Sequence, residues 1–143
     1  MHIRSLMNAD PITVPPDFTM FDARRLMDER RIRHLLVTLA GELRGIVTDR
    51  DIRLNMPSQA TSLSVWELNN LLMRLTVADV MTRTVVTVEP DRDAREAAEI
   101  MLFNKIGALP VIERGRLVGI VTETDLVRAF VGLAADTAGS PTR

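Results

Sequence analysis

The stretch GIVTDRD at residues 45–51 recurs as GIVTETD at residues 119–125, an offset of 74 positions. At this offset residues 5–55 align with residues 79–129 without a gap, and 17 of the 51 pairs are identical. The identical pairs include Pro16 with Pro90, so the turn residues repeat together with the apolar ones. Self-similarity over a whole unit of this length indicates that the chain contains a duplicated structural unit.

Each copy is expected to form a strand, a helix, a hairpin and a second helix. A short β-branched run ends at a proline, and an amphipathic stretch with apolar residues at helical spacing follows it. Two apolar runs joined by Ala-Gly or Arg-Gly then predict a hairpin. The expected first strands are 11–14 and 84–88, the hairpins are 34–48 and 108–122, and the final helices begin at Asp49 and Glu123.

Helix-start signals with a polar side chain three residues before an acidic one are Thr19 with Asp22, Asp93 with Glu96, and Ser64 with Glu67. The last pair opens a linker helix whose apolar residues lie on one stripe. This helix either clasps the two repeats or offers a surface to another subunit. The stripe consists of Val65, Leu68, Leu71, Leu72 and Leu75.

A single copy of about 50 residues buries too little surface to be more than marginally stable. We therefore expect an α/β fold in which two βαββα repeats, related by pseudo-twofold symmetry, pack as one module with a groove between them. The expected boundaries are repeat 1 at 1–55, a linker with an apolar helix at 56–78, repeat 2 at 79–133, and a flexible tail at 134–143.

The motif Thr-x-x-Asp stands at each junction between the hairpin and the final helix. It is Thr48 with Asp51 in repeat 1, and Thr122 with Asp125 in repeat 2. One interpretation is a capping box, in which the two side chains only satisfy the backbone at the helix start. The other is a nucleotide site, in which the helix start and the hydroxyl bind phosphate while the carboxylate accepts hydrogen bonds from ribose.

Gly45 and Gly119 lie inside the preceding strands, where a missing side chain allows either a ligand or a packed backbone to come close.

The ordered, duplicated motifs closely resemble paired CBS domains, the cystathionine β-synthase domains also called a Bateman module. PITVPPD and VVTVEPD stand at the starts, IRHLLV and IGALPV in the middle, and GIVTDRD and GIVTETD at the ends. The resemblance extends from about Ser5 to about Phe130 and is greatest to acetoin-utilisation-type CBS proteins. It implies a regulatory module that is not an enzyme and that binds AMP, ADP, ATP, S-adenosylmethionine or NAD as an effector. It also implies a homodimer and a regulated protein partner.

The same resemblance assigns roles to residues of this chain. Asp51 and Asp125 match the ribose-binding aspartate, and Thr48 and Thr122 match the hydroxyl residue near the phosphate. The remaining matches are the adenine-reading first strands at Ile12, Thr13, Val86 and Thr87, and the apolar base contacts Ile46 and Ile120.

The repeats differ in charge beside the second strand, where Arg33 and His34 of repeat 1 correspond to Gly107 and Ala108 of repeat 2. Relatives often have a basic residue near the phosphates at this position. We expect a phosphorylated nucleotide to prefer the repeat 1 site; the alternative is that Arg33 is a solvated surface charge.

Composition excludes several other classes of protein. There is no cysteine, and the two histidines, His2 and His34, have no metal-ligand spacing, so we expect neither a metal site nor a nucleophile of the cysteine type. No apolar run reaches the length of a membrane span, and no signal-peptide pattern opens the chain, so a cytoplasmic location is expected. Acidic residues interleave the arginines of residues 24–33, which favours a solvated helix face over nucleic-acid binding.

Overall fold

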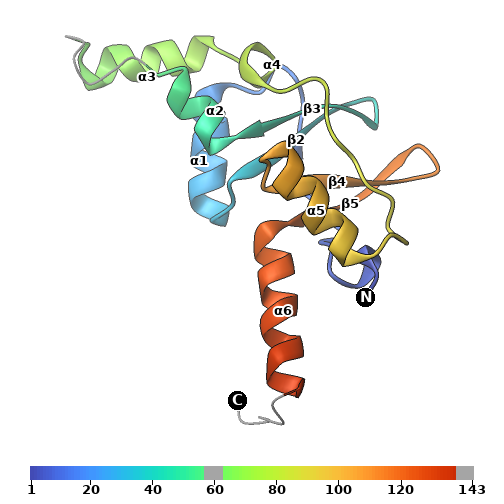
Figure 1. Cartoon of the computed structure of the whole chain (residues 1–143). Coiled ribbons are helices and arrows are strands. Elements are labelled where there is room, and N and C mark those ends of the chain that lie inside the picture. Colours follow the sequence, from blue (N-terminus) through green and yellow to red (C-terminus); the bar gives the residue numbers. More distant parts are fainter. Residues whose placement is uncertain (57–62, 138–143) are drawn as a thin grey trace. The chain divides into compact units, whose positions relative to one another are not determined.

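The computed structural model describes residues 1–56 and 63–137, with the backbone alone at 133–137. Twelve elements follow one another along these residues (Figure 1). In chain order they are η1 Ile3–Ser5, β1 Thr13–Val14, α1 Met20–Arg30, β2 His34–Leu39, β3 Glu42–Thr48, α2 Asp49–Leu54, α3 Val65–Arg74, α4 Val77–Val80, α5 Ala94–Asn104, β4 Ala108–Glu113, β5 Arg116–Thr122 and α6 Glu123–Thr137. The α/β class and the two repeats of related structure are confirmed.

The chain divides into two compact units, which we describe separately. The first unit is Ile12–Val85, and the second unit joins Met1–Pro11 to the chain from Val86 onward. Each unit therefore contains residues from both sequence repeats.

The first unit is a three-stranded sheet covered on one face by helices. Strand β1 is parallel to β2, and β2 is antiparallel to β3. Alternate side chains of a strand point to opposite faces, so one face supplies the core. This core gathers Val14, Leu35, Val37 and Val47 from the strands, Met20, Ala23 and Met27 from α1, and Leu72 from α3.

The second unit repeats this plan with a two-stranded sheet of β4 and β5. The strand expected at 84–88 is reduced to a single bridge, in which Val88 N–H donates to Pro110 O and Ile112 N–H donates to Val88 O. In the first unit the ladder continues because Leu36 N–H reaches Ile12 O. Pro110 stands at the position of Leu36 and has no N–H, so the corresponding bond cannot form.

The predicted helix starts are present. Thr19 accepts a hydrogen bond from Asp22 N at 3.1 Å, and Ser64 accepts one from Glu67 N at 3.1 Å. The Asp93 carboxylate accepts from Arg95 N at 2.9 Å, and not from Glu96 N as the spacing suggested. This bond favours the ionised carboxylate and therefore lowers the pKa of Asp93.

Both hairpins turn through two residues with positive φ, Ala40-Gly41 in the first unit and Arg114-Gly115 in the second. Positive φ at both central residues defines a type I′ turn, whose twist matches that of the flanking strands. The Ala-Gly and Arg-Gly pairs read from the sequence are these turns.

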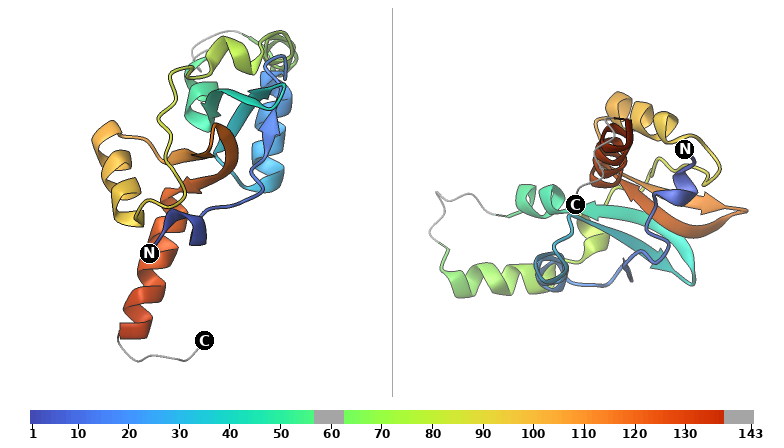
Figure 2. Two further views of the ribbon diagram at one scale, coloured as in Figure 1. Left: turned by 90° about the vertical axis from the view of Figure 1, so that its right-hand side faces the viewer. Right: turned by 90° about the horizontal axis from the view of Figure 1, so that it is seen from below.

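Two short segments are exchanged between the repeats. Ile3 N–H donates to Arg92 O and Arg4 N–H to Pro90 O, so the N-terminal segment packs in the second unit beside β4 and β5 (Figures 1 and 2). The residues at the 74-residue offset make the matching bonds in the first unit, from Val77 N to Phe18 O and from Ala78 N to Pro16 O.

Arg4 strengthens the attachment of the N-terminal segment. Its guanidinium donates to the carboxylates of Glu113 and Asp91, and these two bonds raise its pKa above the ordinary value. The charged side chain therefore joins the exchanged segment to the β4–β5 hairpin and to the loop before α5.

Candidate functional site

The Thr-x-x-Asp motif of the first unit is a complete capping box. Thr48 ends β3 and precedes α2; its N–H donates to Asp51 Oδ2 at 2.8 Å, and its Oγ1 accepts from Asp51 N at 3.1 Å. The capping bonds expected under the structural interpretation are therefore present, and they leave the role of Asp51 in ligand binding a prediction. The capping bond to the carboxylate uses Oδ2 of Asp51.

The motif of the second unit makes the same bonds where β5 meets α6. Thr122 N–H and Oγ1 both donate to Asp125 Oδ2, at 2.9 and 3.1 Å, and Asp125 N donates to Thr122 Oγ1 at 3.3 Å. Two features differ from the first unit: the Thr122 hydroxyl also donates to the carboxylate, and Oδ1 of Asp125 lies 3.6 Å from Nη1 of Arg128 on the next turn of α6.

Another Thr-x-x-Asp pattern, not singled out from the sequence, opens the short helix α4. Thr76 N–H and Oγ1 both donate to Asp79 Oδ2, at 2.8 and 3.1 Å. This box does not stand between a hairpin and its final helix, yet its bonds to the carboxylate match those of Thr122 with Asp125. The pattern alone therefore does not distinguish a ligand site from a helix cap.

Strand register brings most of the predicted site residues of the first unit to one face of the sheet. Thr13 pairs with Leu36, which pairs with Ile46, and His34 pairs with Thr48. These residues alternate with the core residues, so their side chains are on the face opposite the core. Arg33 is next to this face, because its carbonyl accepts a hydrogen bond from Asp49 N at 3.0 Å.

The second unit has the corresponding arrangement. Ile120 pairs with Pro110 and Thr122 pairs with Ala108, again on the face opposite the core strands. Glu123 N–H donates to Gly107 O, as Asp49 does to Arg33. No cation stands at Gly107 or Ala108, so the two faces differ in charge where the sequence indicated.

Two predicted site residues have side chains on the core side. Ile12 packs against the first core and Val86 against the second. For a ligand on the opposite face, these positions offer backbone groups. That is the role that the family resemblance gave to the first strands.

The two strand glycines are explained by packed backbone. A Cβ on Gly45 would lie 2.8 Å from Thr82 O and 2.5 Å from Met81 Sδ, and one on Gly119 would lie 2.7 Å from Asn8 O. At both places the segment is held by paired hydrogen bonds, between Ile46 and Thr82 and between Ile120 and Asn8.

This pairing brings two residues that sequence reasoning missed to the face of each sheet opposite the core, which we call the site face. Thr82 is bridged to Ile46 and Asn8 is bridged to Ile120, and residues paired in this way present side chains to the same face. The sequence indicated these contacts only through Gly45 and Gly119, whose missing side chains leave room for a segment to pack against the strand.

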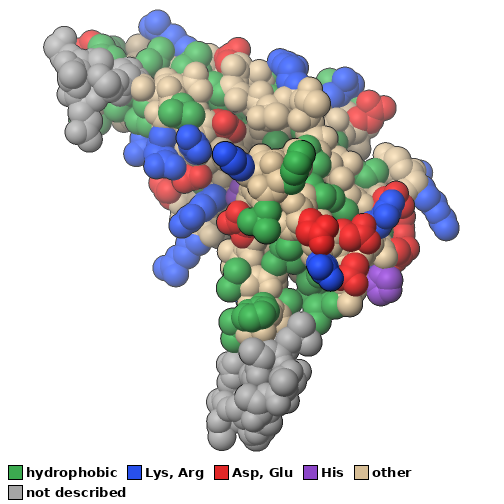
Figure 3. Space-filling view, viewed as in Figure 1, with side chains coloured by type: hydrophobic (Ala, Val, Ile, Leu, Met, Phe, Trp, Pro, Cys, Tyr) green, Lys and Arg blue, Asp and Glu red, His purple; other side chains and the backbone are tan. Residues whose placement is uncertain are grey.

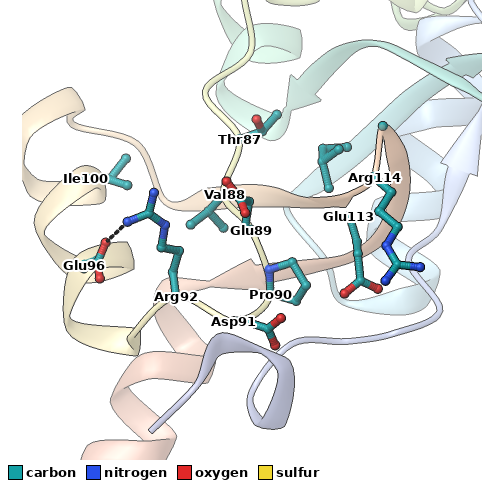
Figure 4. Close-up of a pocket in the computed structure, with 12 residues that line it drawn as sticks. Thr87, Val88, Glu89, Pro90, Asp91, Arg92, Glu96, Ile100, Glu113 and Arg114 are labelled. Carbon is teal, nitrogen blue, oxygen red and sulfur yellow. Dashed lines mark hydrogen bonds and ion pairs between the residues drawn. The ribbon is translucent and has the colours of Figure 1, made fainter.

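A surface groove of about 710 Å³ lies elsewhere in the second unit, beside α5 and the turn of the β4–β5 hairpin (Figure 4). Its lining mixes acidic and basic side chains, and the ion pair of Arg92 with Glu96 closes one side at 3.3 Å. Thr87 is the one predicted site residue in its lining, which includes neither Thr122 nor Asp125. The groove and the Thr-x-x-Asp motif are therefore different places on this unit.

Within residues 1–56 and 63–137 no group of three or more His, Asp or Glu side chains is placed to hold a metal ion. Among the same residues no helix is both long and apolar enough to cross a membrane.

Comparison with known proteins gives a consistent result. The family model described as "CBS domain" matches residues 3–58 and again residues 77–132. A CBS domain-containing protein of Dictyostelium discoideum is 33% identical over 131 residues, which cover 90% of each chain. In the inosine-5′-monophosphate dehydrogenase of Korarchaeum cryptofilum, the matching 123 residues are 38% identical but make up only 23% of that enzyme.

Solved structures with the same fold include one described as an acetoin utilization protein from Vibrio cholerae. It is 30% identical, with a TM-score of 0.79 over 99% of this chain and 98% of that one. The CBS domain pair of the protein MJ0100, in complex with 5′-methylthioadenosine and S-adenosyl-L-methionine, is 26% identical. Its TM-score is 0.74 over 91% of this chain and 99% of that one.

Proposed function

This chain belongs to the CBS-domain family, and on that premise we propose that it is a regulatory module that binds an adenosine-containing ligand and catalyses no reaction. The ligand would be AMP, ADP, ATP, S-adenosylmethionine or NAD. Binding would be transmitted to a protein partner or within a homodimer, because a ligand shifts a conformational equilibrium when it binds one state better than another. We place the module in the cytoplasm.

One observation carries this proposal most directly. In each unit the capping bonds to the carboxylate use a single oxygen, Oδ2, so the acid that caps the helix retains a second oxygen. A carboxylate is an acceptor with two oxygens, and hydrogen bonds to a charged acceptor are the stronger ones. Asp51 and Asp125 are therefore suited to accept ribose hydroxyls while they continue to cap α2 and α6.

The complex of MJ0100 supports the ligand class, since both of its ligands contain adenosine. In this chain Thr48 and Ile46, and likewise Thr122 and Ile120, lie on the face of their sheet opposite the core, and each threonine caps the helix that carries the aspartate. The isoleucine offers an apolar contact for a base and the Thr48 hydroxyl a donor for a polar tail, whereas the Thr122 hydroxyl donates to Asp125 Oδ2.

A homodimer is favoured by the exposed apolar side chains of the second unit. On α6, Val127, Phe130 and Val131 are 61, 71 and 51% exposed, and their spacing makes one stripe. Leu102 and Phe103 on the neighbouring helix α5 are also exposed, and hydrophobic side chains are visible along α6 (Figure 3).

The second candidate function is a structural module that binds no ligand. It is favoured by the capping box of Thr76 with Asp79, because this chain makes the same capping bonds there, outside both proposed sites. The two candidates make opposite predictions for ligand binding and for the aspartate variants.

The test measures thermal unfolding with each adenosine-containing ligand and then repeats it with Asp51→Ala, Asp125→Ala and the double variant. A ligand at 100 times its dissociation constant stabilises the folded state by about 2.7 kcal/mol. We expect the double variant to lose this stabilisation. Asp79→Ala is the matched control, because it removes a cap of the same type outside both proposed sites.

Full ligand stabilisation in the double variant would refute the role of the aspartates, and no stabilisation of the unmodified protein would favour the structural module. Native mass spectrometry of the freshly purified protein would report bound ligand and subunit count together.

Arg33 provides a separate prediction about ligand charge. Arg33 is exposed and its backbone adjoins the site face of the first unit, so Arg33→Ala should weaken ATP or AMP binding by up to about fivefold, the range of a surface charge pair. Adenosine has no phosphate, and its affinity should stay constant. Titration calorimetry measures both, and Arg30→Ala on the same unit controls for net charge. An unchanged ATP affinity would identify Arg33 as a solvated surface charge.

A further inference from the structure

The two proposed ribose acceptors differ in a contact with an arginine. In the second unit Arg128 lies one turn after Asp125, and its Nη1 is 3.6 Å from Asp125 Oδ1, the oxygen that the capping bonds leave over. The residue at the same place after Asp51 is Leu54, whose side chain is 71% exposed. A leucine can make no such ion pair.

The nearby arginines of the first unit do not replace this contact. Arg53 pairs with Asp49 at 3.7 Å, in the same first turn of α2 as Asp51. In the second unit the residue equivalent to Arg53 is Val127. The arginine that follows each motif therefore pairs with a different carboxylate. Arg53 pairs with Asp49 in the first unit, whereas Arg128 pairs with Asp125, the proposed ribose acceptor, in the second.

From this difference we infer that Arg128 competes with a ribose for Asp125 and makes the second site the weaker of the two for ribose binding. The inference rests on the proposed function. A ribose diol that binds Asp125 must displace the guanidinium from Oδ1, whereas Asp51 presents its oxygen to the ligand without that competition. Arg128 acts through Asp125, so it is a positioning residue and not itself a ligand contact.

The size of the effect follows from the exposure of the pair. The Arg128 side chain is 75% exposed and that of Asp125 is 17% exposed, so the pair is partly screened by solvent. Exposed pairs contribute about 0.2–1 kcal/mol, which corresponds to a difference in affinity of about 1.4-fold to fivefold. Salt weakens the ion pair, so the competition of Arg128 with the ligand should decrease at high ionic strength.

This gives the two sites opposite responses to salt. A phosphorylated ligand attracted by Arg33 should leave the first site more readily as salt rises. A neutral adenosine should bind the second site more tightly under the same change, because the competing cation is screened. A purely structural role for Arg128 would not produce that second response.

The experiment uses adenosine as the probe and proteins with one site each. Asp51→Ala leaves the second site; in this background Arg128→Leu should raise adenosine affinity by about 1.4-fold to fivefold at low salt and have no effect at 1 M salt. Arg128→Lys keeps the charge and should keep the unmodified affinity. Arg95→Leu removes an exposed arginine that pairs with Glu99 in the same unit and should change nothing.

The reciprocal variant is Leu54→Arg in the Asp125→Ala background, which should weaken adenosine binding to the first site by a similar factor. If adenosine binds but Arg128→Leu leaves its affinity unchanged or lowers it, the inferred competition by Arg128 is refuted while the proposed function stands. If neither one-site protein nor the unmodified chain binds any adenosine-containing ligand, the proposed function is refuted and this inference with it.

Discussion

Gly119→Ala is expected to destabilise the chain by about 2–4 kcal/mol. The new Cβ would lie 2.7 Å from the carbonyl oxygen of Asn8 and 2.9 Å from Met7 Sδ, distances that real Cβ atoms do not tolerate. Overpacking a tight site costs about 1–3 kcal/mol. The carbonyl of Asn8 also accepts from Ile120 N at 3.0 Å, and each hydrogen bond that shifts or breaks adds about 1 kcal/mol.

Gly45→Ala should behave in the same way in the first unit, since its Cβ would meet Thr82 O at 2.8 Å. Urea unfolding measures both. The matched control is Gly132→Ala in α6, where a Cβ meets nothing within 4 Å and alanine should stabilise the helix by about 1 kcal/mol. If Gly119→Ala shifts the midpoint no more than the control does, residues 7 and 8 are not docked on β5.

These glycines mark the limit of what the sequence predicts. Because both repeats have a glycine at this position, the sequence predicted that another group packs closely against the strand. That group could have been either a ligand or a backbone segment. The structure supplies the backbone. Met7 and Met81 are equivalent at the 74-residue offset, and each packs against a strand of the other repeat. Met81 of repeat 2 packs on β3 at Gly45, and Met7 of repeat 1 packs on β5 at Gly119.

The exchange itself could not be read from the repeat. An offset says which residues have equivalent surroundings, and Ile3 and Val77 have equivalent surroundings whether each packs on its own repeat or on the other one. The hydrogen bonds from Ile3 to Arg92 and from Val77 to Phe18 decide between the two arrangements. Symmetric sequences leave this choice open.

Elements, by contrast, followed the sequence closely where local chemistry decides. The caps at Thr19 and Ser64 and the turns at Gly41 and Gly115 lie where their residue types predicted. The strand at 84–88 was wrong for most of its length because the deciding residue, Pro110, is in another segment. The roles of Asp51 and Asp125 in ligand binding stay predictions, because capping and ribose binding require the same spacing.

The second large effect is expected at Ile3, where Ile3→Ala should cost about 2–5 kcal/mol, the range for deleting a fully buried aliphatic side chain. Ile3 is 0% exposed and belongs to the core of the second unit together with Leu109, Val111 and Val121. Arg95→Ala on α5 of the same unit is the control: its side chain is 85% exposed, so its loss should change the free energy of unfolding by less than about 0.5 kcal/mol.

Hydrogen exchange would locate the effect as well as measure it. Because Ile3 packs in the second unit, Ile3→Ala should first raise amide exchange in β4, β5 and α5, although the substituted residue lies in repeat 1. Val77→Ala, which removes a side chain that is also 0% exposed, should first raise exchange in β2, β3 and α1. The reverse pattern, with each variant loosening the body of its own repeat, would show that the segments are not exchanged.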